Sequence, residues 1–81
     1  MAQKRIPKTG DEFIRLAKRG DCIVRNGHGS HVMVYFGKDK GTQCVPRGNK
    51  QLGPGLHSSL VKAFVAAGLL AMMFGWINLI G

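Results

Sequence analysis

Residues 22–46 read "CIVRNGHGSHVMVYFGKDKGTQCVP", and this stretch decides the fold. Three short apolar runs, at 22–25, 31–36 and 42–46, are separated by "NGHGS" and "GKDKG". Glycine-rich connections of this length are typical of β-hairpins, because glycine adopts the backbone angles that tight turns require. The stretch therefore predicts three strands that pair one after another into an antiparallel sheet.

The middle strand of this predicted sheet has two chemically different faces, because successive side chains point to opposite sides. One face carries three apolar side chains: Val32, Val34 and Phe36. The other face carries a mixed set: His31, Met33 and Tyr35. The apolar set suits a core, so we expect the face that carries His31 to be open.

Helices are predicted before and after the strands. Residues 9–20, "TGDEFIRLAKRG", fit a short helix that Thr9 caps, with Glu12 three residues on as in a capping box. Residues 56–67 fit a second helix with an apolar stripe: Leu56, Leu60, Val61, Phe64 and Val65. The order α-β-β-β-α predicts an α+β fold in which two helices pack on a three-stranded antiparallel sheet. The double-stranded RNA-binding domain has the same order of elements.

The chain of 81 residues is strongly basic, and its composition changes along its length. Lys and Arg number 12 against 4 Asp and Glu, and the net charge of +8 favours a polyanionic partner: nucleic acid, an anionic membrane or an acidic protein. The N-terminus has no apolar signal segment and the chain has only two cysteines, which predicts a cytoplasmic protein without a disulfide framework. We expect a flexible basic N-terminus at 1–8, a domain at 9–68 and an apolar tail at 69–81.

The end of the chain is uncharged from residue 63 to residue 81. As one helix these residues would span ~28 Å, close to the hydrocarbon thickness of a bilayer. If Gly68 ends the second helix, however, the apolar remainder is too short to cross a membrane. Three roles therefore stay open for the tail at 69–81: packing or self-association, contact with a partner protein, and contact with a membrane.

His31 is the candidate catalytic residue. RNA can be cut without a metal when a base takes the proton of a 2′-hydroxyl, that oxygen attacks the adjacent phosphorus, and an acid protonates the leaving oxygen. Imidazole suits either step. Gly29 and Ser30 precede His31 and add little bulk against an incoming RNA backbone. The alternative interpretation of His31 is a solvated surface histidine.

Basic residues near the predicted turn are candidates for binding the RNA phosphates. They are Arg25, Arg47 and Lys50, with Lys38 also in reach. His28, in the turn itself, is either a further RNA contact or a solvated loop residue. His57, in the first turn of the second helix, is expected to be exposed.

A metal site is not predicted. The spacing of Cys22, His28, His31 and Cys44 fits no compact zinc pattern, and the two cysteines suit positions for small buried apolar residues. The few carboxylates form no pair that would hold two metal ions. We therefore expect neither a metal nor another cofactor.

Four short motifs follow one another in a characteristic order: "GSH" at 29–31, "VP" at 45–46, "GNKQL" at 48–52 and "AGL" at 67–69. Through these motifs, residues 10–69 resemble the HicA family of bacterial toxins. The resemblance implies a fold like that of the double-stranded RNA-binding domain and cleavage of single-stranded mRNA by one histidine of the G-S-H turn, here His31. It also implies neutralisation by a HicB-like antitoxin that covers the active face. The alternatives are a non-catalytic RNA- or protein-binding module of the same fold and a small membrane-anchored basic protein.

Overall fold

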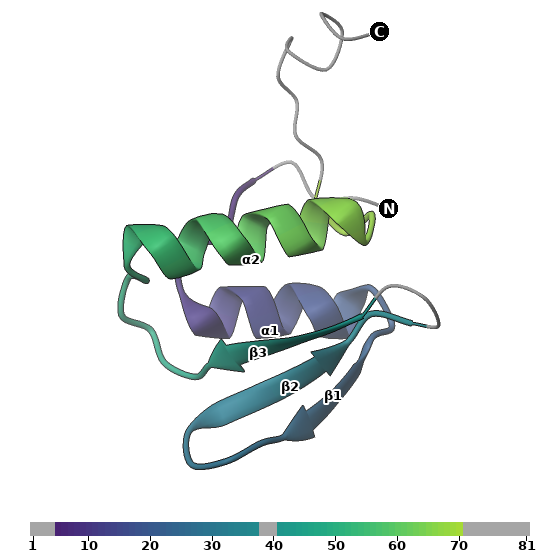
Figure 1. Ribbon diagram of the computed structural model, residues 1–81, viewed down its shortest axis with the longest axis horizontal. Coiled ribbons are helices and arrows are strands. Elements are labelled where there is room, and N and C mark those ends of the chain that lie inside the picture. The colour runs from purple at the N-terminus through teal and green to yellow at the C-terminus, as the bar shows by residue number, and fades with distance from the viewer. Residues whose placement is uncertain (1–4, 38–40, 71–81) are drawn as a thin grey trace, which may run out of the picture.

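The computed structural model describes residues 5–37 and 41–70 and has the predicted order of elements (Figure 1). The elements are α1 (Gly10–Arg19), β1 (Ile23–Asn26), β2 (His31–Tyr35), β3 (Thr42–Pro46) and α2 (Pro54–Ala66). The strands form one antiparallel sheet in the order β1-β2-β3, and both helices lie on the same side of it (Figure 1). The predicted α+β fold is confirmed, and no helix of the described residues covers the other face of the sheet.

The core lies between the sheet and the two helices. Three buried valines line it from the sheet: Val32, Val34 and Val45. From the other side, the ring of Phe64 in α2 lies 4.9 Å from the ring of Phe13 in α1 and 5.0 Å from the ring of Phe36. Aromatic pairs at such distances add to the energy of burial. One aromatic cluster thus joins both helices to the end of β2.

Helix α1 begins where the capping signal places it. The Thr9 Oγ1 accepts a hydrogen bond from Glu12 N at 3.2 Å, and the Glu12 carboxylate accepts one from Lys8 N at 2.7 Å. The first bond satisfies an N–H group that a helix start leaves without an intrahelical partner. The second ties the residue before the cap to the first turn. The segment that precedes α1 is therefore held against the helix.

Helix α2 begins at Pro54 rather than at residue 56, because proline suits the first turn of a helix. The expectation that Leu56 belongs to the core is wrong, since its side chain is 39% exposed. Among the strands, α2 packs against β3, and its N-terminal turn extends past the end of β3 in Figure 1. Leu60, Val61 and Phe64, farther along the stripe, are buried as predicted.

Gly68 ends α2. Its φ of +82° is the left-handed conformation that favours glycine, and Leu69 N donates to Phe64 O while Gly68 N donates to Val65 O, each at 3.0 Å. This pair of bonds closes the helix, so residues 63–81 do not form one continuous helix. Leu70 is 2% exposed and belongs to the core, Leu69 is half-buried against it, and residues 71–81 of the predicted tail lie outside the described residues. Within residues 5–37 and 41–70, no helix has the length and apolar content needed to cross a bilayer.

Gly10 marks a close approach between α1 and the end of β3. A Cβ atom at this position would lie 1.6 Å from Pro46 O, far inside van der Waals contact. Because that oxygen is part of the backbone, we expect Gly10→Ala to displace α1 and to lower the free energy of unfolding by about 1–3 kcal/mol. Gly55→Ala is the control, since a Cβ atom there meets nothing within 4 Å and alanine favours a helix. Urea denaturation measures both variants, and equal stabilities would contradict the close approach.

Candidate active site

His31 is the first residue of β2, and its side chain is exposed on the sheet face that the helices leave uncovered. Val32 and Val34, which alternate with it, are buried under the helices. The strand pairing places Arg25 opposite Met33, so Arg25 shares the open face with His31. Diagonal neighbours on an antiparallel pair lie about 7–8 Å apart, within reach of a long side chain. One histidine and one arginine therefore face the same solvent-exposed surface.

The turn before β2 holds the imidazole in a defined position. Gly27 N donates to His31 O at 2.9 Å and His31 N donates to His28 O at 3.1 Å, which closes the turn. Gly29 has a φ of +64°, a left-handed conformation that glycine adopts without strain. The Nδ1 of His31 lies 3.3 Å from His28 O. A carbonyl oxygen can only accept, so Nδ1 is the donor in this contact, and the neutral tautomer that makes it keeps a lone pair on Nε2 for a base.

Arg47 lies beside this turn although it follows β3 in the sequence. Pro46 is paired with His31 across the sheet, and Arg47 N donates to Ser30 O at 2.8 Å. The Arg47 guanidinium donates to Asn26 Oδ1 at the end of β1. The fold thus brings the backbone of Arg47 next to the G-S-H turn. Its guanidinium is oriented by Asn26, which is paired with Val32 and so lies on the helical face of the sheet.

Two other predicted RNA-binding residues have exposed side chains: His28 in the turn and Lys50 after β3. His28 is exposed, and its backbone oxygen is the group that His31 contacts. Lys50 is exposed in the loop after β3, and its side chain makes no hydrogen bond with the described residues. Lys38 lies outside the described residues.

A positioning residue that the sequence did not reveal is Asp11, in the first turn of α1. Its N–H donates to Gly48 O at 3.0 Å, and its carboxylate accepts from Gly48 N at 2.9 Å. This pair of bonds fixes the backbone beside Arg47. An acid in the first turn of a helix is common for local reasons alone, so only the fold identifies its distant partner.

Two expectations about single residues are wrong, those for Cys44 and His57. Cys44 is exposed, because it lies opposite Met33 on the open face rather than in the core, whereas Cys22 is half-buried and packs against the core. His57 is half-buried rather than exposed: its Nε2 lies 2.7 Å from Pro7 O, and its ring packs edge-on at 6.0 Å from Phe13. Within residues 5–37 and 41–70, no three potential metal ligands come together.

The open face becomes apolar toward the far end of β2. Ile23 and Tyr35 are paired across β1 and β2, and they are 56% and 39% exposed. With Arg25 they line a shallow hollow at this end of the sheet. A face that combines exposed apolar and basic side chains suits contact with another macromolecule.

Comparison of the chain with family models, with curated proteins and with solved structures gives no match. The resemblance to HicA toxins therefore stays a prediction.

Proposed function

We propose that this protein is a HicA-like toxin: a metal-independent, cytoplasmic endoribonuclease that cuts mRNA with His31 as general acid/base. One observation carries the proposal. The imidazole of His31 is exposed on the open face and is oriented through Nδ1, Arg25 shares that face, and the backbone of Arg47 is bonded to the turn that carries His31. The resemblance of residues 10–69 to HicA proteins supplies the class of RNA and the role as a toxin.

The proposed reaction uses the 2′-hydroxyl of the RNA as nucleophile. His31 Nε2 takes the proton of that hydroxyl, its oxygen attacks the adjacent phosphorus, and the bond to the 5′-oxygen breaks. The 5′-oxygen takes a proton from water as it leaves, and the imidazolium of His31 returns its proton to the solvent, so the products carry a 2′,3′-cyclic phosphate and a 5′-hydroxyl. Arg25 and Arg47 offset the negative charge that develops on the phosphate oxygens.

The residues around the turn have supporting roles in this proposal. Gly29 and Ser30 leave room for the RNA backbone, while His28 and Lys50 contact flanking nucleotides. A HicB-like antitoxin would cover the open face, and the exposed side chains of Ile23 and Tyr35 offer it apolar contacts. Such a partner would block access to His31 at the other end of the same strand.

The test is incubation of the purified protein with a long single-stranded RNA in EDTA. We expect fragments that end in a 2′,3′-cyclic phosphate, because the reaction requires no metal. A DNA strand of the same sequence is expected to stay intact, because it lacks the 2′-hydroxyl nucleophile. Gel electrophoresis and end analysis of the fragments measure both results. Loss of cleavage in EDTA, or equal cleavage of the DNA, would contradict the mechanism, and RNA that is bound but never cut would favour a non-catalytic binding module.

A further inference from the structure

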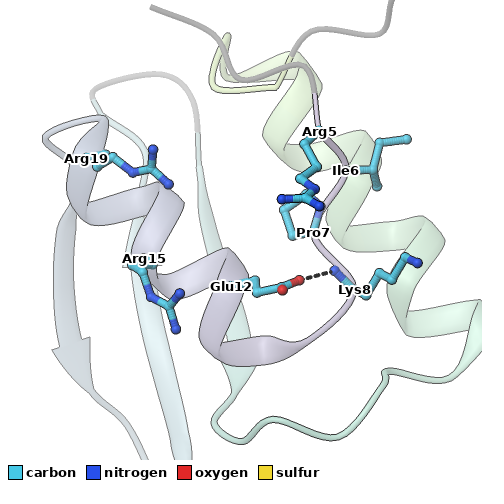
Figure 2. Close-up of a pocket in the computed structure, with 7 residues that line it drawn as sticks. All are labelled: Arg5, Ile6, Pro7, Lys8, Glu12, Arg15 and Arg19. Atoms are coloured by element: carbon cyan, nitrogen blue, oxygen red, sulfur yellow. Dashed lines mark hydrogen bonds between the residues drawn. The ribbon is translucent and has the colours of Figure 1, made fainter.

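A second basic surface lies on the helical side of the molecule, between α1 and the segment that precedes it (Figure 2). It is a hollow of about 370 Å³. Four basic residues and one acid line it: Arg5, Lys8, Arg15 and Arg19, with Glu12. None of these residues belongs to the proposed site around His31. We call this surface the α1 hollow.

The two walls of the α1 hollow are held in place by the fold. On the helix side, Glu12, Arg15 and Arg19 follow one another at intervals of one turn and cover ~10 Å of the helix. On the other side, Pro7 O contacts His57 Nε2 at 2.7 Å and Lys8 O accepts from Leu52 N at 3.0 Å. A preformed site of this kind loses less conformational entropy when a ligand binds.

The α1 hollow has an excess of positive charge. Figure 2 shows the guanidinium of Arg5 on one side and those of Arg15 and Arg19 on the opposite side. Glu12 is the one acid, and the hydrogen bond from Lys8 N, helped by the charges of Arg15 and Arg5, lowers the pKa of its carboxyl. Glu12 is therefore anionic at neutral pH and offsets only part of the charge of four basic residues.

We propose that the α1 hollow is a second binding site for the phosphate backbone of RNA, apart from the site at His31. The proposal rests on RNA being the ligand of this protein, as proposed above. A planar guanidinium group such as that of Arg15 can bind a phosphate through two hydrogen bonds. The centre of a protein–protein interface is usually apolar and poor in charge, so the lining of the α1 hollow suits phosphates better than a protein partner.

The fold connects this surface to the proposed active site. Glu12 lines the α1 hollow, and its neighbour Asp11 is bonded to Gly48 in the loop beside Arg47. An RNA strand held at His31 can therefore continue past the first turn of α1. Binding of one strand at two sites raises its overall affinity, because the second contact forms at a high effective concentration. The α1 hollow would thus favour long RNA over short fragments.

The test measures binding rather than cleavage, with a long 2′-O-methyl RNA that has no free 2′-hydroxyl to act as nucleophile. We expect Arg15→Gln to weaken binding about fivefold and to reduce the slope of log K against log salt by about 0.7. Glu12→Gln is expected to tighten binding, because glutamine still accepts the bond from Lys8 N but removes the negative charge. Lys18→Gln is the control: it removes one charge from an exposed position of the same helix outside the α1 hollow.

The possible results distinguish the proposal of RNA binding at the α1 hollow from the proposal of RNA cleavage by His31. If Arg15→Gln binds RNA like Lys18→Gln, or if Glu12→Gln does not tighten binding, the α1 hollow is not a phosphate site. Cleavage by the wild-type protein alongside that result would leave the proposed function standing. Opposite effects of Arg15→Gln and Glu12→Gln without any cleavage would support the α1 hollow and overturn the nuclease. A wild-type protein that binds no RNA would overturn both proposals.

Discussion

His31→Ala is expected to lower the rate of RNA cleavage by about 10²–10⁴-fold, the usual contribution of a general acid or base. The substitution removes the imidazole and leaves the backbone bonds of the turn, from Gly27 N to His31 O and from His31 N to His28 O. Because the side chain is exposed, the free energy of unfolding should change by no more than about 0.5 kcal/mol. Cleavage in EDTA and urea denaturation of the same sample measure the two effects.

Tyr35→Ala is the matched control for this experiment. It truncates another exposed ring on the same face of β2, at the opposite end of the strand from His31. We expect it to keep cleavage within a few-fold of wild type. If His31→Ala cuts RNA as fast as Tyr35→Ala while both are folded, His31 is not the catalyst. Loss of cleavage in a His31→Ala protein that is unfolded would withdraw the support for catalysis.

Phe64→Ala is expected to lower the free energy of unfolding by about 3–5 kcal/mol, the usual cost of removing a buried phenylalanine ring. Phe64 is fully buried and touches both Phe13 and Phe36, so the cavity would lie between the two helices and the sheet. Small domains have about 5–15 kcal/mol of total stability, so this loss would remove a large fraction of it. Urea denaturation at 25 °C measures the midpoint and the slope of the transition.

Leu56→Ala is the control for Phe64→Ala. It truncates an apolar side chain of the same helix whose exposed fraction is 39%, and we expect a cost below about 1 kcal/mol. Similar losses in the two variants would show that α2 does not pack on the core through Phe64. Below its own unfolding transition, Phe64→Ala should still cut RNA, because Phe64 is buried on the helical side of the sheet.

Local patterns predicted most of the fold. The hairpin connections at 26–30 and 37–41 defined three consecutive strands, and the structure has all three. Thr9 and Glu12 predicted the start of α1, and alternation along β2 predicted which face is buried. These signals act over a few residues, so a sequence reveals them directly. The burial of Leu56 was predicted wrongly. Helical periodicity shows which face of a helix is apolar, but it does not show over what length that face is covered by the sheet.

The candidate site likewise combines residues that the sequence predicted with contacts that only the structure shows. The sequence singled out His31, its open face and its nearby basic residues. It gave no indication that Asp11 holds Gly48, that Asn26 orients Arg47 or that residues 5–8 form one wall of a basic hollow.

The sequence by itself therefore determined the order of the elements, the faces of β2 and the residue most suited to catalysis. Only the tertiary structure decided which distant residues come together: the backbone of Arg47 with the turn at His31, and the side chain of Arg5 with those of Arg15 and Arg19 on one surface. The physical reason is the range of the interactions. Caps, turns and periodicity depend on neighbours in the chain, whereas a shared surface depends on how distant segments are packed by a common core.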